Sequence, residues 1–207
     1  MKRVLSPPGA DDLIQLLKAW RFWVLGAIVG ALAGAALFYL GPPPYRARAT
    51  VLVDFHLEQA WPQNTDREQF YYLERETRKL EEVAMSDATL DAVAHQVSDV
   101  TMQQMRLGKL HLSQPGNGGW HFYADDADAQ IAASLAAAWA QAFTSQVESQ
   151  VVAPSVGGLE PYITVDAAQT TDIPANRSPG LAIYMSAGAL LLLAVAAFGI
   201  LFLDGVP

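Results

Sequence analysis

Clustered acidic side chains are the first candidates for chemistry in this chain. Asp125, Asp126 and Asp128 lie close together, and carboxylate oxygens at such spacing can hold a divalent cation. Helix N-capping explains the same cluster, because aspartates accept hydrogen bonds from the free N–H groups of a first helical turn and interact favourably with the helix dipole. We favour capping, and we predict that Asp125 and Asp126 begin a long helix.

The histidines show no metal-ligand spacing. His111 and His121 could approach each other across a predicted hairpin, but two imidazoles without a third ligand are a weak zinc signal. The sequence also lacks a recognisable nucleophile–base pair, phosphate-binding glycine loop or catalytic carboxylate pair. We therefore predict a non-enzymatic protein without metal or cofactor. The four histidines are His56, His95, His111 and His121.

Two arginines, Arg46 and Arg48, share one face of a predicted strand, and Tyr45 at its start lies on the other face. One interpretation is contact with lipid headgroups and solubility of the strand. The other is pairing with a second subunit, or contact with a pyrophosphate-linked lipid carrier. Some aromatic side chains are suited to stacking on sugar rings, although packing explains them equally well. These are Tyr71, Tyr72, Trp120 and Tyr123.

The elements that must position these residues follow from hydrophobic periodicity. Residues 45–55 alternate in polarity and predict a half-buried strand with an inward face. Thr65 and Glu68 resemble a capping box that opens a helix. We expect its inward residues to be Phe70, Leu73, Leu80 and Ala84. The opposite, solvated side holds Glu74, Arg75, Arg78 and Lys79.

The remaining elements complete an α+β domain. Ser86 caps a shorter helix, and residues 115–119 form the turn of a hairpin. The last predicted strand is 162–166, and 172–179 is an extended, helix-breaking approach to the C-terminal segment. The predicted order is strand, helix, helix, hairpin, long helix, strand. The long helix has an inward stripe of Ile131, Leu135, Ala138, Trp139, Ala142 and Phe143.

Two uncharged apolar segments, 22–40 and 181–203, flank this domain. About 20 apolar residues in a helix cross a bilayer core, so both segments are predicted to span a membrane. Gly26, Gly30 and Gly34 form a GxxxGxxxG face on the first, which permits close helix packing. Its partner is either the second segment of the same chain or a neighbouring protomer.

Charge predicts the orientation. The flank before the first segment is basic, which places the N-terminus in the cytoplasm. We favour a retained span over a cleaved signal peptide, because the apolar run exceeds an ordinary h-region. The net charge of −8 argues against binding of nucleic acid or another polyanion through a broad basic surface, and the absence of cysteine excludes disulfides. The predicted segments are 1–21 (cytoplasmic), 22–40 (span), 41–177 (extracytoplasmic), 178–203 (span) and 204–207 (cytoplasmic).

Several motifs together resemble the Wzz-type chain-length determinants, or polysaccharide co-polymerases. The most specific is the run from residue 44 to residue 53, Pro-Tyr-Arg-Ala-Arg-Ala-Thr-Val-Leu-Val, which resembles the family's strand just outside the membrane. Residues 11–14 and 20–21 resemble its approach to the first span. The Ala-rich helix after the hairpin is similar to the family's long helix. The entry to the second span resembles the family's through Pro174, Arg177 and Pro179.

The resemblance implies a minimal family member, without the long helical extension and without a kinase domain. It implies a homo-oligomer in the bacterial cytoplasmic membrane that regulates chain length, polymerisation or export of a surface polysaccharide. The implied partners are a membrane polysaccharide polymerase, the lipid bilayer and a glycan. Alternatives are a membrane adaptor for a separate tyrosine kinase, or an accessory subunit of another membrane complex. In the chain-length determinant interpretation, the residues that contact neighbouring subunits are Tyr45, Arg46 and Arg48.

Overall fold

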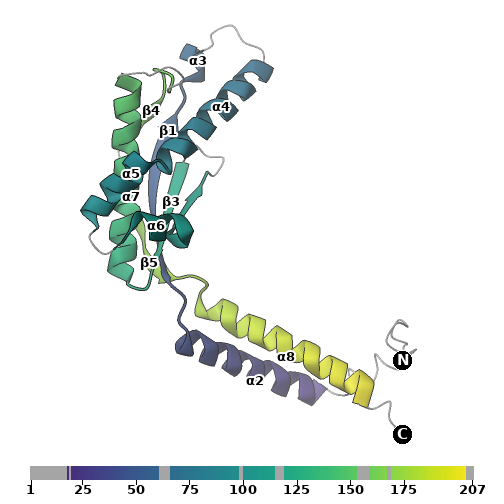
Figure 1. Ribbon diagram of the computed structural model, residues 1–207. Coiled ribbons are helices and arrows are strands. Elements are labelled where there is room, and N and C mark those ends of the chain that lie inside the picture. Colours follow the sequence, from purple (N-terminus) through teal and green to yellow (C-terminus); the bar gives the residue numbers. More distant parts are fainter. Residues whose placement is uncertain are drawn as a thin grey trace. The chain divides into compact units, whose positions relative to one another are not determined.

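The computed structural model describes residues 18, 20–60, 66–97, 100–114, 119–152, 159–166 and 169–203 (Figure 1). The chain forms two compact units. The first contains the two long apolar helices, α2 (Trp20–Leu40) and α8 (Leu181–Leu203). Both are long and apolar enough to cross a membrane. The second unit spans Pro44–Asn176 and is built from an antiparallel sheet and helices, so the predicted α+β class is confirmed.

The second unit follows the predicted order of elements, with short additions. These additions are α3 (Leu57–Ala60), α6 (Met102–Gln104) and the wide helical turn η2 (Met105–Lys109). The principal elements are β1 (Tyr45–Asp54), α4 (Asp66–Ala84), α5 (Asp87–Gln96), β2 (Leu110–Ser113), β3 (Gly119–Asp126), α7 (Ala129–Val152), β4 (Thr164–Val165) and β5 (Gln169–Arg177).

The strand β1 is the centre of the sheet. The order is β2-β3-β1-β4, and β5 also pairs with β1. In the antiparallel β1–β3 ladder, Ala49 stands opposite Phe122. The alternation predicted for β1 is confirmed, because its small and β-branched side chains are buried while their neighbours are partly or fully exposed. The buried residues are Ala47, Ala49, Val51 and Val53.

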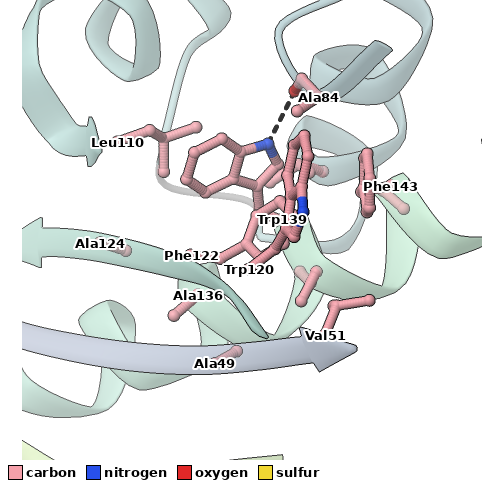
Figure 2. Close-up of a cluster of buried hydrophobic side chains, with 14 of the residues drawn as sticks. Ala49, Val51, Ala84, Leu110, Trp120, Phe122, Ala124, Ala136, Trp139 and Phe143 are labelled. Carbon is pink, nitrogen blue, oxygen red and sulfur yellow. Dashed lines mark hydrogen bonds between the residues drawn. The ribbon is translucent and has the colours of Figure 1, made fainter. Parts of the chain in front are cut away.

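The core lies between the sheet and α7. Figure 2 shows its aromatic rings beside Ala49 and Val51 of β1. The Trp139 ring meets Phe122 edge-to-face at 4.8 Å, and Trp120 stacks on Phe143 at 5.7 Å. The buried Trp139 Nε1 donates a hydrogen bond to the carbonyl oxygen of Ala84 at 2.8 Å, which ties α7 to the last turn of α4. The inward stripe predicted for the long helix is buried except for Ile131, which is half-buried.

The inward face of α4 differs from the prediction in its first half. Leu80 and Ala84 are buried as expected, but Phe70 is 63% exposed and Leu73 is only partly buried. Tyr72 and Glu76 take the buried positions instead. Glu76 can be buried because its Oε1 accepts from Arg75 at 2.8 Å and lies 2.9 Å from Lys79 Nζ. Hydrophobic periodicity does not reveal a carboxylate that is buried through such pairs.

The N-cap predicted for α5 is confirmed. Ser86 Oγ accepts a hydrogen bond from the N–H of Thr89 at 3.2 Å. Leu90 and Val93 are fully buried, and Val97 is buried just beyond the helix. The Thr65 and Glu68 capping box lies outside the described side chains, and so does the hairpin turn at 115–118.

Asp125 and Asp126 do not begin the long helix, which corrects the prediction. They are the last residues of β3, and Asp126 stands opposite Tyr45 at the start of β1. Asp128 opens α7 instead, since its Oδ1 accepts from the N–H of Gln130 at 2.7 Å and from that of Ile131 at 3.2 Å. Strand pairing extends through the two aspartates because each has a cationic partner. Asp125 pairs with Arg46, and Asp126 pairs with Lys109.

The C-terminal part of the sheet also differs from the prediction. The strand expected at 162–166 is reduced to the two residues of β4. The segment 172–179, expected to be an extended approach, contributes most of an additional strand, β5, which includes Pro174. Proline is tolerated there because β5 pairs with β1 as a strand outside the main path of the sheet.

The glycine face of α2 packs against α8 of the same chain. A β-carbon placed on Gly30 would lie 2.8 Å from the Cα of Ala189 and would overlap the carbonyl oxygen of Gly188. One placed on Gly34 would overlap the carbonyl oxygen of Tyr184. Small residues therefore bring the two backbones into direct contact, as they do in closely packed membrane helix pairs. Of the two partners considered for this face, the second apolar segment is the one it contacts.

Candidate functional site: the polar face of the sheet

Polar side chains gather on the face of the sheet opposite the aromatic core. The strands alternate, so residues between the buried positions of β1, β3 and β2 share this second face. The strand register places Arg48 opposite Tyr123, with His111 on the far side of Tyr123. Here the polar face means Arg46, Arg48, Thr50, His111, His121, Tyr123 and Asp125.

Arg46 forms a two-point ion pair within the chain. Its Nε donates to Asp125 Oδ1 at 2.7 Å, and its Nη2 donates to Oδ2 at 2.6 Å. The hydrogen bond with Asp125 raises the pKa of Arg46 further above its ordinary value, against the opposing effect of burial. His111 Nε2 lies 3.4 Å from the same carboxylate. Arg46 is therefore engaged in cross-strand pairing, a partner that sequence reasoning missed because it expected Asp125 to lie in a helix.

Arg48 differs from Arg46, although both lie on the same strand face. Its Nε is buried and has no hydrogen-bond partner among the residues that the structure describes. Its charge also acts on His121: burial lowers the pKa of that imidazole, and the Arg48 charge lowers it further. His121 is therefore predominantly neutral near pH 7. Arg48 combines a fixed positive charge with an unused donor.

Aromatic and hydroxyl groups surround the two arginines. The Arg46 guanidinium lies 5.9 Å from the centre of the Tyr123 ring, and His121 meets that ring edge-on at 6.1 Å. Thr50 Oγ1 and His121 Nδ1 are hydrogen-bonded at 3.0 Å. Together the groups offer positive charge, an aromatic surface and hydrogen-bonding atoms, which suits binding of a polar or anionic ligand better than catalysis.

The other residues singled out from the sequence lie elsewhere. Tyr45 is partly buried at the start of β1 and stands opposite Asp126. Arg177 ends β5, and its guanidinium lies 5.5 Å from the centre of the Phe38 ring on α2. Pro179 is exposed just before α8. Pro174 lies within β5, but its side chain lies outside the described residues, as do positions 204–207.

The sequence allowed His111 and His121 to approach each other across the hairpin, but the two are not directly opposite in the ladder. In the register, His111 stands opposite Tyr123, whereas His121 stands opposite Ser113 and Thr50. Within the described part of the chain, no group of three or more histidine or acidic side chains is placed to hold a metal ion. The aspartate cluster acts in ion pairing and helix capping there.

Removing Asp125 should weaken the sheet moderately. We expect Asp125→Ala to lower the free energy of unfolding by about 1–2 kcal/mol, between the values typical of exposed and buried ion pairs. The Arg46 side chain is 37% exposed, so water compensates part of the loss. Urea unfolding of the full chain in detergent measures it. The control is Arg78→Ala, an exposed i,i+4 partner of Glu74, and equal losses in both variants would contradict a specific role.

Acid should weaken the second unit through Asp126. Burial raises the pKa of this carboxyl, but the Lys109 hydrogen bond, the N–H groups of Asp128 and Ala127 and the Lys109 charge together lower it below its ordinary value of 3.8. Its contribution to stability is therefore present above that value and is lost as the pH falls through the lower folded-state pKa. We expect Asp126→Asn to flatten the decline of unfolding free energy below about pH 4. Identical acid profiles for the wild type and the variant would contradict this.

Comparisons with known proteins identify no relative: no protein-family model matches the chain, and no curated protein matches it significantly.

Proposed function

We propose that this chain is a non-enzymatic membrane protein that regulates the chain length, polymerisation or export of a cell-surface polysaccharide. It would act as a minimal Wzz-type co-polymerase: a homo-oligomer that scaffolds or regulates a membrane polymerase. The mechanism is positioning, with the two spans docking to the polymerase and the outer domain meeting the growing glycan.

One observation carries the proposal most directly. Two long apolar helices pack together, and between them in the sequence lies a single α+β unit. Its first strand follows α2 after four residues, 41–44, and its last strand leads to α8 after three, 178–180. This arrangement fits the layout that the motifs at 44–53 and 174–179 resemble.

We place the protein in the bacterial cytoplasmic membrane with both termini inside. The support is the basic flank before α2, because positive charge beside a span is retained in the cytoplasm. The unit 44–176 then lies on the outer side. The flanking residues concerned are Lys2, Arg3, Lys18 and Arg21.

The oligomer contacts we propose lie in the outer domain. The glycines at 26, 30 and 34 face α8 of the same chain, so this face is already occupied within the chain. The start of β1, at Tyr45 and Arg46, remains as a surface for neighbouring subunits. Arg and Tyr are enriched in protein interfaces.

Gel analysis of surface polysaccharide tests this function. We expect cells with the intact gene to show a clustered length distribution, and cells with the gene deleted to show a broad or short one. Re-expression of the intact protein should restore the clusters. An unchanged distribution and normal amount after deletion would contradict length control and favour an adaptor or accessory role.

A further inference from the structure

We propose that Arg48 and Tyr123 form a subsite that binds a carboxylate-bearing sugar, such as a hexuronic acid unit of an acidic polysaccharide. The inference rests on the proposed function, because it names the class of glycan that the outer domain meets. The subsite is part of the polar face defined above.

Arg48 carries unused hydrogen-bonding capacity. Its Nε is buried, and the described residues supply no acceptor for it. A guanidinium has five N–H donors, and a buried donor without an acceptor costs free energy relative to one that is hydrogen-bonded. The residue as a whole is only half-buried, so an anionic oxygen from outside the chain would meet its terminal N–H groups rather than the buried Nε, and would neutralise its charge.

The nearest carboxylate on this face is already engaged. Both oxygens of Asp125 accept from Arg46, and His111 lies beside one of them. Asp125 is therefore occupied by a different arginine. The same pair also shows that an arginine on this strand face can hold a carboxylate at two points, there through Nε and Nη2. At Arg48, where Nε is buried, the ligand would bind through the two terminal nitrogens instead.

The groups beside Arg48 suit a sugar. Tyr123 stands directly opposite it in the β1–β3 ladder, and His111 follows in β2. Neighbouring strands are about 5 Å apart, so the three positions form a short row across the sheet. Tyr123 presents a ring for an apolar sugar face and a hydroxyl for hydrogen bonding. The adjacent row contributes Thr50 and Ser113.

The charge of the chain limits where an acidic ligand can bind. The whole chain has a net charge of −8, so an acidic polymer would be repelled except where a local cation compensates. The neutral His121 adds no charge there near pH 7. Binding should therefore depend on Arg48 and on the carboxylate of the sugar, and neutral glycans should bind much more weakly.

Calorimetric titration of the full chain in detergent tests this. The probe is an oligomer of galacturonic acid, and the controls are its methyl ester and a neutral maltooligosaccharide of equal length. We expect only the free acid to bind. Arg48→Gln should weaken this binding about tenfold or more, as expected for a lost charged hydrogen bond. Arg78→Gln, on exposed α4, should leave it unchanged.

Two outcomes would overturn the subsite. One is no binding of the free acid to the wild type, and the other is equal affinity of the free acid and its ester. The latter comparison needs no mutation, so a misfolded Arg48→Gln chain would not obscure it. Equal weakening by Arg48→Gln and Arg78→Gln would also reject Arg48 as the anion ligand.

The polysaccharide gel separates the subsite from the proposed function. If gene deletion alters chain length but the acid does not bind, the subsite fails and the function stands. If the acid binds through Arg48 but deletion leaves chain length unchanged, the subsite stands and the function fails. An Arg48-dependent preference for glucose 1-phosphate over the uronate would contradict the carboxylate and indicate a phosphate-bearing ligand.

Discussion

Gly30→Leu should separate α2 from α8 and abolish a disulfide engineered between them. A β-carbon at Gly26 would lie 3.8 Å from the Cβ of Ala196, which matches the spacing of a disulfide, typically about 3.8 Å. Gly26→Cys with Ala196→Cys should therefore cross-link readily on oxidation, with no competing thiol because the chain has no cysteine. Adding Gly30→Leu forces the backbones apart, so cross-linking should fall to the level of single-cysteine chains. Non-reducing gels measure it.

Two controls test whether the loss of cross-linking is specific to the glycine face and occurs within one chain. Ala36→Leu places the same side chain on an exposed side of α2 and should leave the cross-link intact. Co-expression of one chain carrying only Gly26→Cys with another carrying only Ala196→Cys should give no cross-linked dimer. A dimer in that mixture would show that the glycine face meets a neighbouring chain, contrary to the packing described here.

Trp139→Ala should cause the largest loss of stability in the α+β unit. The side chain is fully buried, packs on Phe122 and hydrogen-bonds the carbonyl of Ala84. Truncating a buried tryptophan typically costs about 3–5 kcal/mol. This is a large part of the free energy of unfolding of a domain, which is about 5–15 kcal/mol. Urea unfolding of the full chain in detergent, followed by far-UV circular dichroism, measures the loss.

Trp139→Phe separates the hydrogen bond from the packing. It keeps an aromatic ring but leaves the Ala84 carbonyl without its donor, so we expect a loss of about 1–3 kcal/mol. Leu107→Ala is the control, because that apolar side chain is 79% exposed and its loss should change stability by about 0.5 kcal/mol or less. A loss for Trp139→Ala no larger than that control would contradict the central role of the ring.

Regular alternation and periodicity made much of the fold predictable. The inward residues of β1 are small or β-branched at every second position, and α7 repeats apolar residues at helical spacing. Both elements bury the side chains that these patterns selected, apart from Ile131, Tyr45 and Phe55, which are half-buried. The two apolar helices were predictable for the same reason, since an uncharged run of that length has one dominant interpretation.

Paired charges account for most of the remaining differences. Asp125 and Asp126 resemble a helix start, but Arg46 and Lys109 hold them in β3. Glu76 resembles a surface residue, but its carboxylate is buried because Arg75 and Lys79 pair with it while their own side chains stay partly exposed. These two partners are local, but hydrophobic periodicity considers apolar residues only. The partners of the two aspartates lie on β1 and in η2, so the local pattern carries no sign of them. The polar face was only partly predictable for this reason: Arg46 and Arg48 were identified, but the Asp125 pair was not.

The central place of β1 also determines the order in which the α+β unit can assemble. As the ribosome makes the chain, β1 emerges first, yet its partners β3, β4 and β5 follow much later; the Arg46–Asp125 contact alone spans 79 residues. Closing such loops before any pairing energy is gained slows folding. Until those partners arrive, β1 presents two unpaired edges. The nascent α+β unit therefore needs protection from misassociation until synthesis has passed β5.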